Sequence, residues 1–310
     1  MRYLVRDLQN QQTAVSTVWL QQYRQLLDGE RRQVTPGTPA LVQARKQRRL
    51  AAFGTWLTIS LDTVLLFVLE IGLNIVLFFG TFAVFVLGGH YLDNGKQIGS
   101  AINQAIADSG NWLISSTIGL ALGGLAVQLS IVLVLYLRVV RSSTLSWADL
   151  GFGPALRQNA LRALAIGLGL GLLAFVASTV VLSLLQDLHQ NVKGQEETFK
   201  AARHSPLASF IPFAITVAIT APLAEEAFFR AYALRALTVR YGVGVGVIIS
   251  SALFALLHLA GDPQIGWVTL PLFIVGAILG WGYARTGNLI TNVTAHAMNN
   301  IIGLAILYYN

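Results

Sequence analysis

The residues that can do chemistry gather in the last third of the chain. Two adjacent carboxylates, Glu225 and Glu226, precede Arg230 in the segment APLAEEAFFR. One histidine, His258, ends the apolar segment SALFALLH, and another, His296, lies inside a later apolar segment. An ionisable side chain at membrane depth is costly, and its presence there indicates function by default. These residues are therefore the first candidates for a site.

The spacing of these residues is helical. Glu226 and Arg230 are four residues apart, so they share a helix face and can form an ion pair. Glu225 is turned by about 100° from Glu226 on the same helix, so we expect it to remain free. The same spacing of four residues recurs in the pairs Phe254–His258 and His296–Asn300.

Two predicted turns bring these groups to one level. If a helical hairpin turns at Tyr241–Gly242, Glu225 lies sixteen residues before the turn and His258 lies about as far after it. His296 lies nine residues past Gly287 in the next turn, or about 14 Å at helical rise, and Asn300 lies one turn deeper. We expect these four groups to converge at a buried level.

A carboxylate beside an imidazole in a site of low dielectric can activate water, because either group can accept its proton. A second imidazole and a carboxamide can donate hydrogen bonds to an oxyanion. Glu225, His258 and His296 are also acceptable ligands for a divalent metal such as zinc. The residues alone therefore leave a metal cofactor open.

In chain order, three motifs follow on successive hydrophobic segments: Glu225-Glu226-x-x-x-Arg230, Phe254-x-x-x-His258 and His296-x-x-x-Asn300. Together they resemble the signature motifs of the CPBP family of intramembrane proteases, which comprises CaaX proteases and bacteriocin-processing enzymes and is also called the Abi family. The resemblance runs over residues 205–307, about a third of the chain.

The resemblance implies hydrolysis of a peptide bond inside the membrane. Glu225 and His258 would activate water, and His296 and Asn300 would donate to the oxyanion. Residues in supporting roles would be Glu226, Arg230 and Phe254. Members of the family are often described as metalloproteases, and a metal-free mechanism that depends on glutamate is also argued. No residue of the three motifs departs from the family's pattern.

The composition predicts the fold that holds these motifs. Of 310 residues 11% are charged, against about 25% in soluble domains, and 55% are hydrophobic. The chain is therefore predicted to be an all-α, polytopic membrane helical bundle. The absence of cysteine excludes disulfide scaffolds, cysteine-ligated metal clusters and a cysteine nucleophile. The apolar stretches predict about seven transmembrane helices, at Val64–Gly89, Trp112–Leu137, Ala160–Leu185, Ala208–Phe229, Val243–Ala260, Val268–Tyr283 and Ile290–Tyr308.

Three regions follow from the change in composition along the chain. Residues 1–51 are basic and amphipathic and are predicted to be cytoplasmic or interfacial. Residues 52–150 hold the N-terminal transmembrane helices, and residues 151–310 form the catalytic core. The apolar run from Ala52 is long enough for nearly two spans, but it has no central turn signal, so one span is preferred.

The distribution of charge predicts the orientation. Seven spans from a cytoplasmic N-terminus place 17 Lys and Arg residues inside, Arg230 among them, and four outside. The basic residues are therefore predicted to set the orientation of the chain in the membrane, and no nucleic-acid partner is expected. The expected partners are membrane lipids and a peptide or membrane-protein substrate, whereas the oligomeric state stays open. The glycines at 167, 169 and 171 are predicted to form a close-packing helix surface.

Two other classes of function are also compatible with these residues. A small-solute or ion transporter would use the same buried polar groups as a binding site, but the sequence shows no internal repeat. A catalytically inactive membrane scaffold or immunity protein would keep the fold without the reaction. Asp62 and Glu70, eight residues apart, could line a pathway, but they are predicted to lie at the membrane interface.

Overall fold

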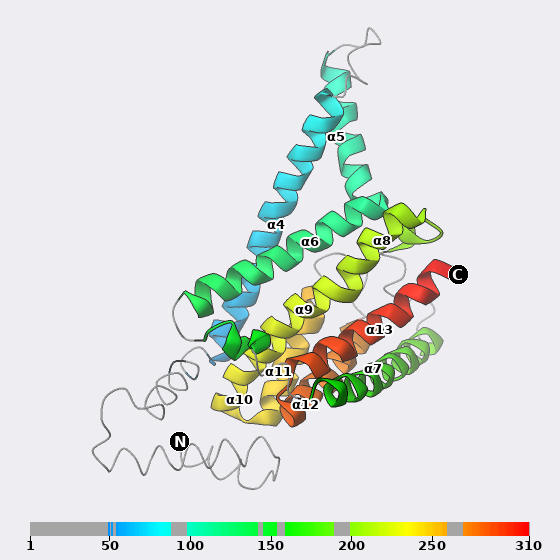
Figure 1. Cartoon of the computed structure of the whole chain (residues 1–310). Coiled ribbons are helices and arrows are strands. Elements are labelled where there is room, and N and C mark those ends of the chain that lie inside the picture. The colour runs from blue at the N-terminus through cyan, green and yellow to red at the C-terminus, as the bar shows by residue number, and fades with distance from the viewer. Residues whose placement is uncertain are drawn as a thin grey trace, which may run out of the picture.

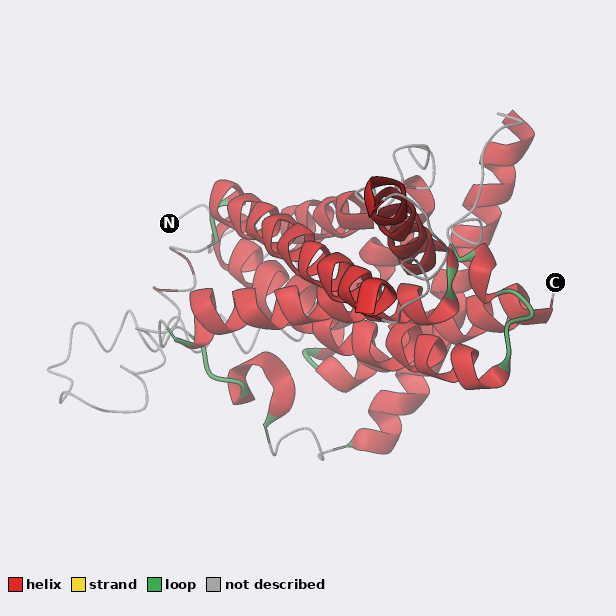
Figure 2. Cartoon of the chain, turned by 90° about the horizontal axis from the view of Figure 1, so that it is seen from above, coloured by secondary structure: helices red, strands yellow, loops and turns green. Residues whose placement is uncertain are grey.

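The computed structural model describes residues 49, 51, 54–87, 98–141, 145–153, 159–188, 199–258 and 269–309. Within these ranges all regular structure is helical and there is no strand, which confirms the all-α prediction. Most of the predicted amphipathic N-terminal region, residues 1–48, lies outside the described residues. In Figures 1 and 2 the helices form one bundle, and Figure 1 shows a hairpin of two helices that projects from it.

The projecting hairpin is formed by α4 (Trp56–Leu87) and α5 (Ile98–Ser115) (Figure 1). The preference for a single helix after Ala52 is confirmed, although the helix begins at Trp56 rather than at Val64. The predicted span Trp112–Leu137 is wrong at its start, because Ser116 caps a new helix there. Its hydroxyl accepts a hydrogen bond from the Gly119 N–H at 2.9 Å.

The helix that starts at this cap is α6 (Thr117–Val134), and it continues as a π-helical segment, η1 (Leu135–Val140). A short π-helical segment, η2 (Ala148–Phe152), follows it. Next along the chain come α7 (Ala160–Leu188) and a 3₁₀ turn, η5 (Lys200–Ala202).

The two carboxylates of the first motif lie on one continuous helix that runs from Leu207 to Tyr241, 35 residues long. It passes through α8 (Leu207–Ile215), η6 (Thr216–Thr220), α9 (Ala221–Glu226), η7 (Ala227–Leu234) and α10 (Arg235–Tyr241), of which η6 and η7 are π-helical. The predicted end at Phe229 is wrong, since the helix does not stop at Arg230. That arginine is fully buried and paired, so it behaves as a core residue rather than as a loop cation.

Three helices complete the bundle: α11 (Val243–Leu257), α12 (Thr269–Thr286) and α13 (Leu289–Tyr309). Both predicted turns are confirmed. Gly242 has φ 86° and Gly287 has φ 60°, a left-handed conformation that favours glycine at the end of a helix.

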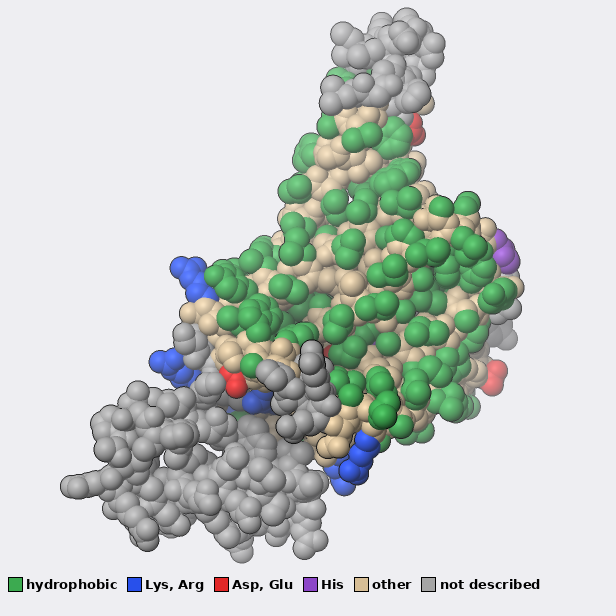
Figure 3. All heavy atoms as spheres, in the orientation of Figure 1, with side chains coloured by type: hydrophobic (Ala, Val, Ile, Leu, Met, Phe, Trp, Pro, Cys, Tyr) green, Lys and Arg blue, Asp and Glu red, His purple; other side chains and the backbone are tan. Residues whose placement is uncertain are grey.

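Five of the described helices are long and apolar enough to cross a membrane, and the apolar helix α11 is shorter. The five are Leu57–Val86, Thr117–Val140, Ala160–Leu188, Leu207–Tyr241 and Leu289–Tyr309. A helix is present at each of the seven predicted positions, with α11 and α12 in addition to these five. Figure 3 shows hydrophobic side chains over most of the visible surface of the described residues. The protein is therefore a multi-pass helical membrane protein.

The core is centred on η7, where the aromatic side chains of Phe228, Phe229 and Tyr232 are fully buried. Asp62 of α4 is 1% exposed rather than interfacial. It accepts hydrogen bonds from the Tyr232 hydroxyl at 2.6 Å and from Arg138 Nε at 2.7 Å. This cluster ties α4 and η1 to the long helix.

Close packing of α7 on α13 depends on two of the three predicted glycines. A Cβ at Gly167 would lie 2.6 Å from the Thr291 carbonyl oxygen, and one at Gly171 would lie 2.7 Å from Met298 Cβ. A Cβ at Gly169 would meet nothing within 4 Å. Gly169 is thus on the other side of α7, because two residues turn an α-helix by about 200°.

Candidate active site

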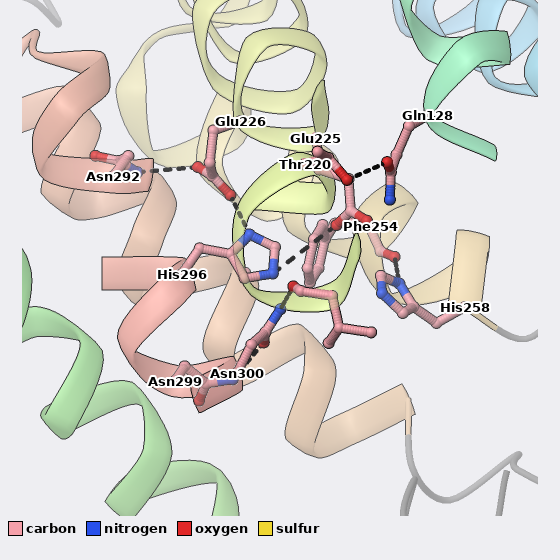
Figure 4. A network of polar contacts seen from close by, with 12 residues as sticks. Gln128, Thr220, Glu225, Glu226, Phe254, His258, Asn292, His296, Asn299 and Asn300 are labelled. Carbon is pink, nitrogen blue, oxygen red and sulfur yellow. Dashed lines mark hydrogen bonds and ion pairs between the residues drawn. The ribbon is translucent and has the colours of Figure 1, made fainter. Parts of the chain in front are cut away.

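Glu226 is the centre of the polar cluster inside the bundle. Its side chain is fully buried, and Oε1 accepts hydrogen bonds from Arg230 Nη1 at 2.9 Å and from His296 Nδ1 at 3.0 Å (Figure 4). Oε2 accepts a hydrogen bond from Asn292 Nδ2 at 3.2 Å. One carboxylate on the long helix therefore fixes two side chains of α13.

Arg230 neutralises Glu226, as its helical spacing predicted. The guanidinium is fully buried, and Nη2 donates to the Gly276 carbonyl of α12 at 3.1 Å. Its Cζ lies 4.7 Å from the centre of the Phe254 ring, so a cation–π contact adds to the ion pair. The supporting role expected of Arg230 and Phe254 thus has a physical basis in charge balance and packing.

Asn292 is a member of the cluster that the sequence analysis missed. It is fully buried, and its Nδ2 also donates to the Leu279 carbonyl of α12 at 2.7 Å. A signal was available, because Asn292 precedes His296 by four residues and so shares its helix face. Asn292, His296 and Asn300 thus continue one polar face along α13 for two turns.

Glu225 and His296 face each other across the site. In Figure 4 the His296 ring lies between the two carboxylates. Since Nδ1 is bonded to Glu226, Nε2 is the nitrogen that faces Glu225, at 3.9 Å from Glu225 Oε2. Within the described residues this Oε2 is a buried atom with no hydrogen-bond partner. As predicted, no Lys or Arg among the described residues forms an ion pair with Glu225, in contrast to Glu226.

His258 stands apart from this cluster, contrary to the expected convergence. It caps the C-terminal end of α11, where its Nδ1 lies 2.8 Å from the Phe254 carbonyl oxygen. The Phe254 ring contacts both imidazoles, with ring centres 4.8 Å from His258 and 5.7 Å from His296. No hydrogen bond or ion pair links His258 to Glu225 within the described residues, because equal heights along two helices do not bring side chains into contact.

Asn300 contacts the long helix at Val217, eight residues or about two turns before Glu225. Its Nδ2 donates to the Val217 carbonyl in η6 at 2.9 Å. That carbonyl needs a side-chain donor, because the Ala221 N–H donates to Thr216 and Pro222 has no N–H. The amide keeps a second N–H, which is the group that a reaction intermediate could use. The neighbouring Asn299 donates from its Nδ2 to Asn300 Oδ1 at 3.1 Å and so fixes the orientation of the amide.

The set predicted to bind a metal does not form a ligand cluster here. Within the described ranges no group of three His, Cys, Asp or Glu side chains is placed to hold a metal ion. Glu225 and His296 are near each other, but His258 lies on the far side of Phe254. The arrangement of these three described side chains does not fit a shared metal.

Comparison with known protein families adds an independent observation. Residues 207–302 match the family described as type II CAAX prenyl endopeptidase, Rce1-like. The resemblance to the CPBP family is confirmed. The match begins with α8, contains the whole polar cluster and ends inside α13, after Asn300. Comparisons with curated proteins and with solved structures give no match. The C-terminal third of the chain is therefore Rce1-like, which supports an enzyme of the protease type.

Proposed function

We propose that this protein hydrolyses a peptide bond of a membrane-associated peptide, with a prenylated C-terminal CaaX sequence as its substrate class. The family match supplies the reaction class and the substrate class. The observation that carries the chemistry is the buried Glu225 oxygen without a hydrogen-bond partner among the described residues, 3.9 Å from His296 Nε2. A water molecule bonded to both atoms at about 2.8 Å each fits that separation.

In the proposed reaction Glu225 is the general base. It takes a proton from the water while the oxygen attacks the carbonyl carbon, and it then returns that proton to the nitrogen of the breaking C–N bond. His296, fixed by Glu226, accepts the second hydrogen bond of the water through Nε2 in its neutral form. This differs from the oxyanion role that the resemblance implied for His296.

The second N–H of Asn300 is proposed to stabilise the oxyanion. Its other N–H is held by Val217, so the amide is oriented before substrate binds. We keep His258 as a second proton-transfer group on the substrate side. With Nδ1 at the Phe254 carbonyl, only Nε2 can reach a substrate.

The test is cleavage by purified protein in proteoliposomes. Three probes would be compared: a farnesylated fluorogenic CaaX peptide, the same peptide without the lipid, and a bacteriocin leader peptide. We expect the farnesylated peptide to be cut fastest. Glu225→Gln should lower the rate by roughly 10²–10⁴-fold. The matched control is Glu70→Gln, a partly buried carboxylate in α4 away from the cluster, which should cleave like the wild type.

Each other result points to a different class of function. A folded wild type that cuts none of the three probes would contradict the protease proposal and favour an inactive scaffold or immunity protein. Flux of a small solute or ion through the same proteoliposomes, lost in Glu225→Gln, would instead indicate a transporter. Faster cleavage of the unmodified peptide would keep the reaction and replace the substrate class.

We also propose that the N-terminus is cytoplasmic. With Arg230 removed from the count of loop cations, 16 of the 17 predicted inside Lys and Arg remain, against four outside. In Figure 3 the visible Lys and Arg side chains of the described residues gather at the end of the bundle where α10 ends. That end would face the cytoplasm.

A further inference from the structure

One buried polar side chain near the site lies outside the part of the chain that matches the family. Gln128 of α6 is 6% exposed and stands in the middle of an apolar helix. A carboxamide at membrane depth is costly unless it is hydrogen-bonded, so its partners show what it does. Ser130, two residues later in α6, is also buried, but its hydroxyl donates only to Ala126 of its own helix, at 2.9 Å.

Both hydrogen bonds of Gln128 cross to the π-helical segment η6. Nε2 donates to the Thr216 carbonyl at 3.3 Å, and Oε1 accepts from the Thr220 hydroxyl at 2.5 Å (Figure 4). Gly124, one turn earlier in α6, permits this approach, because a Cβ there would lie 2.8 Å from Thr216 Cγ2. Gln128 thus clamps both ends of a segment of five residues.

The segment η6 is linked to two groups of the candidate active site, Glu225 and Asn300. Glu225 follows it by five residues on the same helix. The Val217 carbonyl accepts a hydrogen bond from the Asn300 amide. It is next to the Thr216 carbonyl, which accepts one from Gln128. Since η6 departs from regular α-helical hydrogen bonding, side chains of α6 and α13 complete its polar contacts. A shift of η6 would therefore move Glu225 and Asn300 relative to each other.

We propose that Gln128 is a positioning residue for the hydrolysis, acting through Thr220 and Thr216 on the geometry of Glu225 and Asn300. This inference rests on the proposed function. It means that α6, outside the Rce1-like part, is a component of the catalytic unit. Gln128 itself does not touch the substrate.

A buried amide that only stabilises the fold would make the same hydrogen bonds, so the experiment must separate stability from catalysis. We would measure kcat, KM and the melting temperature with the farnesylated CaaX probe for Gln128→Met, Thr220→Val and the double variant. Misplacement of reacting groups by a fraction of an ångström to 1 Å lowers the rate strongly. We expect kcat to fall roughly 10–100-fold in each single variant, with KM nearly unchanged.

Three comparisons make the result specific. The double variant should be no slower than Gln128→Met alone, because that change already removes the hydrogen bond between Gln128 and Thr220. Thr220→Ser keeps the hydroxyl and should restore most of the rate. Ser130→Ala, at the buried hydroxyl on the same helix that bonds only within α6, should have the wild-type kcat.

The inference fails if Gln128→Met has the wild-type kcat, or if its rate falls only in proportion to the fraction of folded protein. Glu225→Gln in the same assay separates this failure from that of the proposed function. If Glu225→Gln is inactive while Gln128→Met is as active as wild type, only the positioning role is wrong. If Glu225→Gln still cleaves, the proposed mechanism is wrong whatever Gln128 does.

Discussion

At the scale of single residues, the adjacent carboxylates have different surroundings and so different roles. Glu226 is bonded by Arg230, His296 and Asn292, whereas Glu225 Oε2 has no partner among the described residues. A carboxylate with satisfied oxygens is suited to hold neighbouring groups in place. One with an unsatisfied oxygen is suited to accept a proton. The sequence could anticipate this division, because only Glu226 has a cation four residues away.

The first residue-scale prediction concerns stability. Arg230→Ala should lower the free energy of unfolding by about 3–5 kcal/mol, because it leaves the Glu226 carboxylate buried without its cation. The measurement is thermal or denaturant unfolding in detergent. Arg240→Ala, at an exposed arginine of the same helix, is the control and should unfold like the wild type. The double variant Glu226→Gln with Arg230→Met should recover part of the loss, since no charge is then unpaired. A wild-type stability for Arg230→Ala would contradict the ion-pair argument.

The second residue-scale prediction concerns the oxyanion. Asn300→Ala should lower kcat by roughly 10²–10³-fold with little change in KM, because an oxyanion forms only along the reaction. Asn74→Ala is the control, since within the described residues the Asn74 amide donates only to the Glu70 carbonyl of its own helix. A lower melting temperature with an unchanged kcat would mean that Asn300 only holds the Val217 carbonyl.

The third residue-scale prediction tests the metal directly. The described ligand geometry does not join His258 to Glu225 and His296, so we expect chelators to leave the wild-type rate unchanged. The metal content of the purified protein, measured on the same samples, should be the same in His296→Ala as in the wild type. Inhibition by a chelator that is reversed by zinc would contradict this prediction and would favour metal binding by Glu225, His258 and His296.

At the scale of helices, the site depends on how closely α7 approaches α13. Gly167 and Gly171 are buried against α13, within the stretch that carries Asn292 and His296. Small residues at such contacts let membrane helices approach closely. The glycine pattern predicted a packing surface, but the sequence alone could not tell which of the three glycines face another helix.

The element-scale prediction follows from this contact. Gly171→Ala should destabilise the protein by about 1–3 kcal/mol and reduce cleavage, because the added methyl forces α13 away from α7. Gly169→Ala is the matched control, two residues earlier on the open side of α7, and should unfold at the wild-type temperature or slightly above it. Equal unfolding temperatures for the two variants would show that α7 does not pack on α13 in this way. Activity and unfolding should be measured on the same samples.

At the scale of the whole molecule, orientation can be tested at the two ends of the long helix. Lys200 precedes the helix Leu207–Tyr241 and Arg240 lies in its last turn, and both side chains are exposed. At helical rise this helix is roughly 50 Å long. The chain has no cysteine, so a single one can be introduced at either position without background. We expect Arg240→Cys to react with a membrane-impermeant maleimide only from the cytoplasmic side, and Lys200→Cys only from the outside. The reverse pattern would overturn the proposed topology.

The sequence by itself determined the fold class, the turns and the motif residues. Low charge and long apolar runs require helices in a membrane, because the backbone must satisfy its own hydrogen bonds there. Glycine at 242 and 287 marked the turns, since only a residue without Cβ takes a positive φ freely. The pair Glu226–Arg230 could be predicted because both residues are on one helix, where spacing fixes the distance.

Only the tertiary structure decided what meets across helices. The rotation of each helix about its axis sets which side chains meet, and spacing along one helix does not contain that rotation. For this reason Glu225 lies close to His296, as predicted, but makes no hydrogen bond or ion pair with His258 within the described residues, while Asp62 is buried against Tyr232. The hydrogen bonds between Gln128 and η6 join residues 88 and 92 positions apart in the chain, and no local pattern can indicate them.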